Sequence, residues 1–241
     1  MTSLPQQTAL VTGASSGIGQ ATALALAQAG VNLVLVGRSL ERLEAVTHAA
    51  QKAQVTVTAY GLDLLDLPQV KSRIVQLFEQ HFPINILINN AGMGYTGSLA
   101  EMSLENWQKV LDLNLTSSFL CIQGALPYLR QQESSTIINI SSIAASQAFP
   151  QWGGYSVSKA ALAMLSKAIA VEERSHGIRV TLITPGAVNT PIWDTETVDA
   201  DFDRSQMLTP ETVAQAIVHA ALLPPGAVIE ELIVTPSAGA L

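Results

Sequence analysis

The stretch of sequence that decides the fold is Thr8-Ala9-Leu10-Val11-Thr12-Gly13-Ala14-Ser15-Ser16-Gly17-Ile18-Gly19, which runs directly into a helical segment rich in Ala and Leu. The short apolar run predicts a buried strand, and the glycines predict a tight turn into the helix. Glycines at such a turn also let the backbone approach a pyrophosphate, which the amides and dipole of a helix N-terminus stabilise. The spacing G-x-x-x-G-x-G differs from the G-x-G-x-x-G dinucleotide fingerprint, so a simple strand-to-helix connection is the alternative.

Short runs rich in Val, Ile and Leu alternate with longer helical stretches along the chain, a pattern typical of parallel βαβ units. The pattern predicts one α/β domain over residues 1–241, with a doubly wound, seven-stranded parallel sheet and helices on both faces. In that setting the nucleotide-binding interpretation of the turn is favoured, because the turn follows the first strand. The predicted strands cover 8–11, 32–36, 56–60, 84–89, 136–140, 179–184 and 231–234, and helices begin near Ser16, Ser39, Asp66, Ser103, Gly154 and Thr209.

The long irregular stretch from 185 to 208 is unusual for a compact fold, where such loops are functional lids or disordered segments. We expect a substrate lid over residues 186–208.

Charge and composition exclude several classes of protein. The 241 residues include 12 Lys and Arg against 19 Asp and Glu, and this net charge of −7 gives no overall positive field for binding nucleic acid. No apolar run approaches the ~20 residues that cross a bilayer, so no membrane partner is expected. Residues 1–7 lack the basic start and apolar segment of a signal peptide, which predicts a cytoplasmic protein. The single cysteine and four scattered histidines predict neither a disulfide framework nor a metal site.

Arg38 follows the second predicted strand, where an NAD-selective fold usually carries an acid for the ribose 2′-hydroxyl. An arginine can instead make a forked contact with a 2′-phosphate. It could also be a solvated surface residue, although a cation at a helix N-terminus opposes the helix dipole. We therefore predict NADP(H) as the coenzyme.

Tyr155 and Lys159 are spaced i and i+4, on one face of the predicted helix that begins near Gly154. A free tyrosine titrates near 10, so it exchanges protons at neutral pH only when a nearby cation favours its anion, and Lys159 supplies that cation. Ser142 follows the strand predicted over 136–140, on the rim where ligands bind in open α/β sheets, with Ser141 as its competitor. Taken alone, Tyr-x-x-x-Lys is also found by chance as an ordinary surface pair.

These residues resemble the classical short-chain dehydrogenase/reductase family in its single-domain form, which has a Rossmann fold. The resemblance extends from Thr8 to about Pro236. The family's motifs occur in the family's order: the turn over 12–19, Asp63-Leu64, Asn89-Asn90-Ala91-Gly92, Asn114, Ser142, Tyr155 with Lys159, and Pro185-Gly186 followed by Thr190.

The resemblance implies an NADPH-dependent reductase of ketones and other carbonyl compounds that also runs in reverse as an alcohol dehydrogenase. Tyr155 would be the acid in reduction and the base in oxidation, while Ser142 would bond the substrate oxygen. Lys159 would lower the Tyr155 pKa and hold the nicotinamide ribose, and Asn114 would hold a water of a proton relay. The implied cofactor-binding residues are Gly13, Ser15, Ser16, Gly17, Ile18, Gly19, Arg38, Ser39, Asp63, Leu64, Asn90, Ala91, Gly92, Tyr155, Lys159, Pro185, Gly186, Val188 and Thr190.

Two departures from the family stand out. Ser16 occupies a position where some NADP-specific members carry a second basic residue. Arg38 is therefore expected to be the main residue that selects NADP(H) over NAD(H), helped by Ser15 and Ser39. Ala145 replaces a glycine that many relatives have after the serine pair.

The predicted substrate pocket is apolar and aromatic, which suits an uncharged ketone, a diketone or a flat heterocycle. A broad ketone reductase is therefore the first expectation. A 3-oxoacyl-[acyl-carrier-protein] reductase and a sepiapterin-like pterin reductase are the alternatives within the family, and a non-catalytic NADP(H) sensor is the alternative class. The pocket residues are Met93, Gly94, Ala144, Gln147, Phe149, Trp152 and Trp193.

Charged residues make up only 13% of the chain, against roughly 25% in ordinary soluble domains. In the family, the helices that correspond to 103–129 and 155–172 pair across two-fold axes. Their long apolar faces here predict a homotetramer, with a dimer as the next possibility, unless the sheet of one subunit covers them entirely.

Overall fold

The first strand, β1 (Thr8–Thr12), lies in the middle of a seven-stranded parallel sheet and carries the glycine-rich turn at its carboxyl end. Successive side chains of a strand point to opposite faces of the sheet. Ala9 and Val11 accordingly belong to the core on one face and Leu10 to the core on the other. The computed structural model describes residues 7–239; the remaining residues of the predicted domain, 1–6 and 240–241, lie outside the described part.

The strand order is β3-β2-β1-β4-β5-β6-β7, which confirms the predicted doubly wound Rossmann-type sheet. The order reverses between β1 and β4, and ligands of open α/β sheets bind at such a switch point. The strands agree with the predicted ones to within two residues at either end. They are β2 (Asn32–Gly37), β3 (Val57–Gly61), β4 (Ile86–Asn89), β5 (Ser135–Ile140), β6 (Ile178–Pro185) and β7 (Glu231–Val234).

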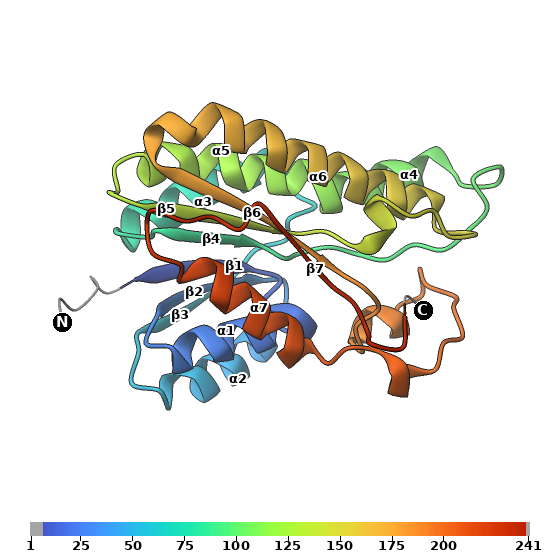
Figure 1. Cartoon of the computed structure of the whole chain (residues 1–241), viewed down its shortest axis with the longest axis horizontal. Coiled ribbons are helices and arrows are strands. Elements are labelled where there is room, and N and C mark those ends of the chain that lie inside the picture. The colour runs from blue at the N-terminus through green and yellow to red at the C-terminus, as the bar shows by residue number, and fades with distance from the viewer. Residues whose placement is uncertain (1–6, 240–241) are drawn as a thin grey trace.

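Helices cover both faces of the sheet, as Figure 1 shows. One face carries α1 (Gly17–Gln28), α2 (Leu40–Gln51) and α7 (Pro210–Ala221). The opposite face carries α3 (Leu67–Gln80), α4 (Leu104–Leu111), α5 (Ser117–Leu129) and α6 (Gly153–Glu173). Within residues 7–239, none of these helices has the length and apolar character needed to cross a membrane.

The helix expected to run unbroken from Ser103 to 129 is instead divided by a π-helical turn, η1 (Asp112–Thr116). Ser103 begins it as predicted, because its hydroxyl accepts a hydrogen bond from the Asn106 amide at 3.1 Å. The wider turn contains Asn114, which is completely buried. Single π-helical turns are frequent at functional sites, and this one lies behind the carboxyl end of β4.

The predicted lid has more structure than the sequence indicates. It contains two 3₁₀ turns, Pro191–Asp194 and Arg204–Gln206, and Val188 forms a bridge with Leu208 at its base. Figure 1 shows the lid as an orange segment beyond the sheet, near α7.

Candidate active site

A cavity of about 710 Å³ opens at the carboxyl ends of the strands, where the strand order reverses. Its volume is within the range of small-molecule sites. The cavity brings together most of the residues singled out in the sequence: Gly13, Ser15, Ser16, Gly17, Ile18, Arg38, Asp63, Leu64, Asn90, Ala91, Gly92, Met93, Ser142, Ala144, Phe149, Trp152, Tyr155, Lys159, Pro185, Gly186, Val188, Thr190 and Trp193.

The glycine-rich turn forms one wall of the cavity and has the properties of an anion site. Gly13 has φ +64°, and a Cβ there would lie 2.9 Å from Ala91 Cα, so only glycine fits between the ends of β1 and β4. Ser16 precedes α1 without any side-chain capping bond among residues 7–239, and the first turn of α1 carries no acidic residue. The amides at this helix end are thus left for a negatively charged ligand.

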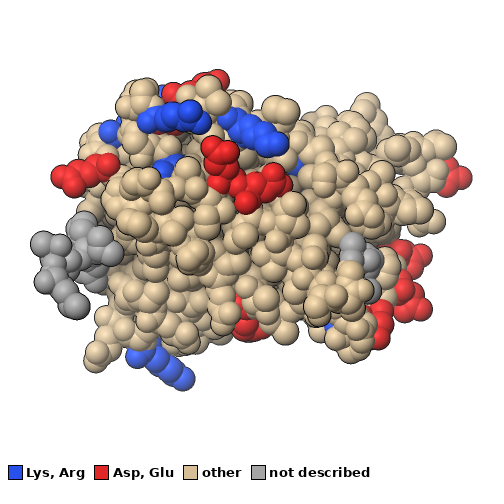
Figure 2. Space-filling model, in the orientation of Figure 1, with Lys and Arg blue, Asp and Glu red and all other residues tan. Residues whose placement is uncertain are grey.

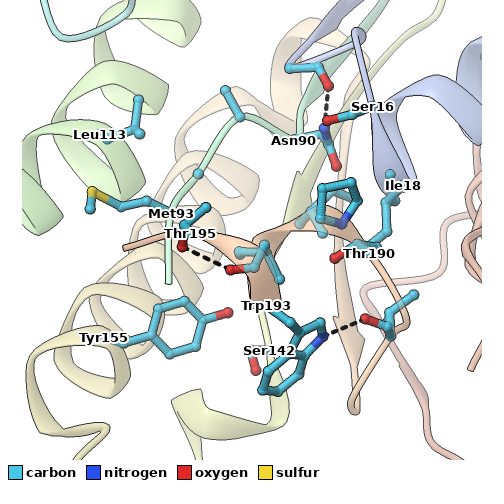
Figure 3. Close-up of a pocket in the computed structure, with 18 of the residues that line it drawn as sticks. Ser16, Ile18, Asn90, Met93, Leu113, Ser142, Tyr155, Thr190, Trp193 and Thr195 are labelled. Atoms are coloured by element: carbon cyan, nitrogen blue, oxygen red, sulfur yellow. Dashed lines mark hydrogen bonds between the residues drawn. The ribbon is translucent and has the colours of Figure 1, made fainter. Parts of the chain in front are cut away.

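Thr12 and Asn90 join the ends of β1 and β4 beneath this turn. The Thr12 hydroxyl accepts hydrogen bonds from the amides of Asn90 at 3.0 Å and Ala91 at 3.1 Å. The Asn90 side chain donates in return to the carbonyl of Thr12 at 3.0 Å and to that of Gly13 at 3.2 Å. Asn90 therefore holds the shape of the turn in addition to lining the cavity, as Figure 3 shows.

Tyr155, Ser142 and Lys159 lie together on the opposite wall. In Figure 3 the Tyr155 hydroxyl points into the cavity from α6, and Ser142 lies on the same side below Trp193. The Lys159 ammonium lies 5.9 Å from the centre of the Tyr155 ring and donates a hydrogen bond to the Ile140 carbonyl at 2.9 Å. This is the arrangement that the i, i+4 spacing predicts.

The neighbouring serines have different partners, which supports the choice of Ser142 over Ser141. The Ser141 hydroxyl is buried and donates to the Lys159 carbonyl at 3.2 Å, so it is used in attaching β5 to α6. Ser142 accepts a hydrogen bond from the Ala144 amide at 3.2 Å, and its hydroxyl faces that of Tyr155, whose pKa it lowers.

Burial dominates the protonation of both titratable groups. It raises the pKa of Tyr155 above its usual value, and the hydrogen bond with Ser142 lowers that pKa by a smaller amount. Burial also lowers the pKa of Lys159 to about 8. The pKa of Tyr155 is thus raised and not lowered in the protein without coenzyme, in contrast to the expected effect of Lys159, because desolvation of the phenolate is the largest cause of the shift. A protonated Tyr155 at neutral pH is the form that can donate a proton.

Asn114 does not line the cavity; it lies just behind it. Its side chain accepts from the Met93 amide at 2.8 Å and donates to the Met93 carbonyl and to the Ser158 hydroxyl, each at 3.0 Å. A Cβ on Gly92 would lie 3.1 Å from Asn114 Oδ1 and 3.4 Å from Lys159 Nζ. The glycine thus leaves the space between the two polar groups and the cavity open.

Four further predicted residues do not line the cavity. Gly19 is needed for packing, because a Cβ there would lie 2.2 Å from the Gly13 carbonyl oxygen. Ser39 caps α2 by accepting from the Arg42 amide at 3.3 Å. Gly94 packs under Val198 of the lid, and Gln147 is exposed to solvent outside the cavity.

Aromatic side chains form the wall of the cavity nearest the lid. The ring of Trp152 is in edge contact with that of Tyr155 at 5.3 Å between centroids and with that of Trp193 at 5.6 Å. Trp193 also contacts Phe202 at 5.4 Å and donates from its indole to the Val188 carbonyl at 2.7 Å. The two tryptophans therefore line the cavity, as predicted, and their contacts also hold the segment over 186–208 in place.

Several residues that line the cavity were not predicted from the sequence. Leu113 and Ile143 are adjacent in sequence to predicted residues, and Phe202 could have been noticed as an aromatic side chain in the lid. Leu65 also follows a predicted residue, whereas Arg42 and Lys109 had no sequence signal of their own. Outside the predicted lid, the unpredicted lining residues are Gly37, Arg42, Leu62, Leu65, Lys109, Leu113, Ile140 and Ile143; within the lid, they are Ala187, Pro191, Ile192, Asp194, Thr195, Glu196, Thr197 and Phe202.

The fold and the cavity define the class of protein: a Rossmann-type domain with a nucleotide-binding turn facing a tyrosine, a lysine and a serine. Comparison with known proteins is more specific. The model of the family described as short chain dehydrogenase matches residues 7–201, and the chain belongs to this family of oxidoreductases.

Three similar proteins illustrate the range within the family. A 3-oxoacyl-[acyl-carrier-protein] reductase of Synechocystis sp. is 37% identical over 202 residues, covering 83% of this chain and 81% of that protein. The sepiapterin reductase of Chlorobaculum tepidum is 32% identical over 237 residues, covering 95% and 96%. The structure of an alcohol dehydrogenase from Thermococcus sibiricus, complexed with 5-hydroxy-NADP, superposes with a TM-score of 0.88 at 27% identity, covering 97% of this chain and 98% of that one.

Proposed function

We propose that this protein is an NADPH-dependent carbonyl reductase that also oxidises the corresponding secondary alcohols. The observation that carries the proposal is the placement of the Tyr155 hydroxyl, with Ser142 beside it, in a cavity whose other wall is the glycine-rich turn. The proton donor and the anion site thus share one cavity. Among residues 7–239, no three His, Cys, Asp or Glu side chains lie close enough together to bind a metal ion.

The residues present fit a dinucleotide. The uncapped end of α1 and the glycine cradle at Gly13 suit a pyrophosphate, and Lys159 and Thr190 line the same cavity. Arg38 lines it at the end of β2, where a 2′-phosphate would be recognised. The coenzyme in the structure of the Thermococcus alcohol dehydrogenase is of the same kind.

When bound, a nicotinamide coenzyme supplies or takes up the hydride. Tyr155 donates its proton to the carbonyl oxygen as negative charge develops there, and Ser142 donates a hydrogen bond to the same oxygen. Lys159 would hold the nicotinamide ribose, and its ammonium, 5.9 Å from the centre of the Tyr155 ring, would stabilise the tyrosine anion after proton transfer. Asn114 fixes the Met93 backbone beside Lys159. In oxidation, the same groups act in the reverse order.

The substrate end of the cavity supports a small, uncharged carbonyl compound. Its wall is formed by the rings of Trp152, Trp193 and Phe202, and the charged residues that the lid contributes are Asp194 and Glu196. Figure 2 shows acidic side chains over the end of the molecule where Figure 1 places the lid. An acidic carrier protein prefers a basic landing patch, which argues against an acyl-carrier-protein substrate.

The aromatic wall also favours one specific second candidate, the reduction of a pterin side-chain carbonyl. The sepiapterin reductase of Chlorobaculum tepidum is 32% identical to this chain over nearly its whole length. A planar heterocycle would fit against the rings of Trp152 and Trp193.

A substrate panel tests the proposal. Oxidation of NADPH followed at 340 nm should show turnover with simple ketones or diketones, and parallel assays with NADH should be slower. Sepiapterin and an acyl-carrier-protein thioester in the same panel separate the alternatives. Binding of NADPH without turnover of any carbonyl compound would favour the non-catalytic sensor.

We further propose a homotetramer, with a dimer as the alternative. The outer surface of α4, α5 and α6 exposes large apolar side chains, among them Leu104 (78% exposed), Met164 (65%) and Val171 (72%). Monomeric proteins seldom leave such residues together in solvent. Light scattering coupled to size-exclusion chromatography measures the assembly directly, and a monomer at micromolar concentration would contradict it.

A further inference from the structure

A second arginine lines the cavity close to Arg38, at the start of α2, and it was not predicted from the sequence. Arg42, in the first turn of α2, lines the same cavity as Arg38. Within residues 7–239, neither guanidinium group has an ion pair or a side-chain hydrogen bond. Both side chains are exposed and reach the cavity from its rim.

The local packing holds Arg42 at this position. Ser39 caps α2 through the Arg42 amide at 3.3 Å, so the hydroxyl that was expected to bind the coenzyme instead fixes the backbone of the arginine. Leu43, the next residue, is completely buried and lies against Gly37. On the other side, Leu40 packs on Gly61 at the end of β3. The rotation of the first turn of α2 is therefore set by two leucines.

The charges around this end of the cavity require an explanation. Cations in the first turn of a helix are opposed by the helix dipole, and two arginines near each other also repel. The acidic residues of α2 do not line the cavity, and Asp63, the acid that follows β3, uses a carboxylate oxygen to accept from the Leu65 amide at 3.0 Å. An external anion would compensate both guanidinium groups.

We propose that Arg42 is a specificity-determining residue for the coenzyme, and that it binds the 2′-phosphate of NADP(H) together with Arg38. The inference rests on the proposed function only in that the chain binds NADP(H). A phosphomonoester has three oxygens and close to two negative charges, so it can accept from two guanidinium groups at once.

Equilibrium binding to the coenzyme-free protein tests the proposal without any turnover. Titrations with NADPH and NADH, and with adenosine 2′,5′-bisphosphate and adenosine 5′-monophosphate, would be compared for the wild type, R38A, R42A and R42K. We expect R42A to raise the Kd of NADPH and of the bisphosphate about tenfold, as for loss of a charged hydrogen bond. The Kd values of NADH and of the monophosphate should change less than about twofold, and R42K should fall between wild type and R42A.

Lys52→Ala is the matched control, because Lys52 is a cation at the far end of α2, outside the cavity. It should leave all four Kd values unchanged. The role of Arg42 would be overturned if R42A weakened NADPH and NADH equally, and likewise the bisphosphate and the monophosphate. It would also be overturned if R42A weakened none of them, or if Lys52→Ala had the same effect as R42A. A wild type that binds NADPH no more tightly than NADH would overturn the proposed coenzyme preference as well, so the two failures can be told apart.

Discussion

The two ends of the cavity are built in different ways. The nucleotide end is formed by the carboxyl ends of β1, β2, β3 and β4, with backbone groups and glycines facing the ligand. The lid end is formed by side chains of a long connection, and these are held by contacts between distant segments. The Thr197 hydroxyl donates to the Gly94 carbonyl at 2.8 Å, and the Thr96 amide donates to the Thr197 carbonyl at 2.9 Å.

Two glycines show most clearly how the two ends of the cavity differ. A Cβ on Gly19 would lie 2.2 Å from the backbone oxygen of Gly13, which cannot move without opening the turn. A Cβ on Gly94 would lie 2.7 Å from the terminal Cγ2 of Val198, whose lid segment can shift. The nucleotide end should therefore respond to mutation as a rigid unit, and the lid should respond by changing its position.

The largest effect is expected for Gly19→Ala. The added methyl should open the turn, lower the free energy of unfolding by about 3 kcal/mol and weaken NADPH binding at least tenfold. Chemical denaturation and nicotinamide fluorescence measure the two quantities. Gly226→Ala is the control, because a Cβ there meets no atom within 4 Å, and it should change neither. Full stability and normal NADPH binding in Gly19→Ala would show that the turn is not rigid.

The second prediction concerns Lys159, whose pKa burial lowers to about 8. Because the unfolded chain then binds this proton more tightly than the folded protein, the wild type should gain stability as the pH rises through 8 toward 10.5. Relative to Lys159→Met, the gain between pH 7 and pH 10 should be about 2 to 3 kcal/mol. Urea denaturation of both proteins across this range measures it. A difference that stays constant with pH would contradict the burial of a titrating ammonium.

Gly94→Ala tests the other end of the cavity and should have a smaller effect on stability, about 1 kcal/mol, because a side chain and a movable segment absorb the clash. We expect the KM for a reduced ketone to change severalfold while the Kd of NADPH stays the same. Kinetics and coenzyme titration on the same sample give both values. Equal loss of NADPH affinity would mean that the two ends are not independent.

The smallest effect is expected for Arg204→Ala, which removes an exposed ion pair with Asp194 at 2.6 Å across the lid. Exposed pairs contribute 0 to about 1 kcal/mol, so the unfolding midpoint should hardly change. The lid should nevertheless become more mobile, which hydrogen exchange of the amides near Trp193 would detect. Unchanged exchange in this segment would show that the aromatic contacts alone hold the lid.

The contrast between the two ends also explains what the sequence could predict. Strand periodicity and the Thr8–Gly19 stretch indicated the parallel sheet and its glycine-rich turn, because these depend on local patterns. The spacing of Tyr155 and Lys159 was sufficient to bring them together on α6. The ordered motifs of the family added Ser142 and Asn114.

Other features depend on long-range contacts and left no local signal. The π-helical turn around Asn114 and the lid contacts to Thr96 are set by packing between distant segments. Ser39 was predicted to help bind the coenzyme, and in the structure its hydroxyl caps α2. Its position in the sequence is compatible with either role. Gln147 was predicted to line the pocket, but it is exposed to solvent and does not line the cavity.

The most direct measurement of the central claim compares wild type with Tyr155→Phe in two assays on the same preparation. We predict that the variant keeps most of its affinity for NADPH and loses turnover of a ketone by a factor of about 10² to 10⁴, the range attributed to general acid catalysis. Turnover within a fewfold of wild type, at unchanged NADPH affinity, would contradict the assignment of Tyr155 as the proton donor.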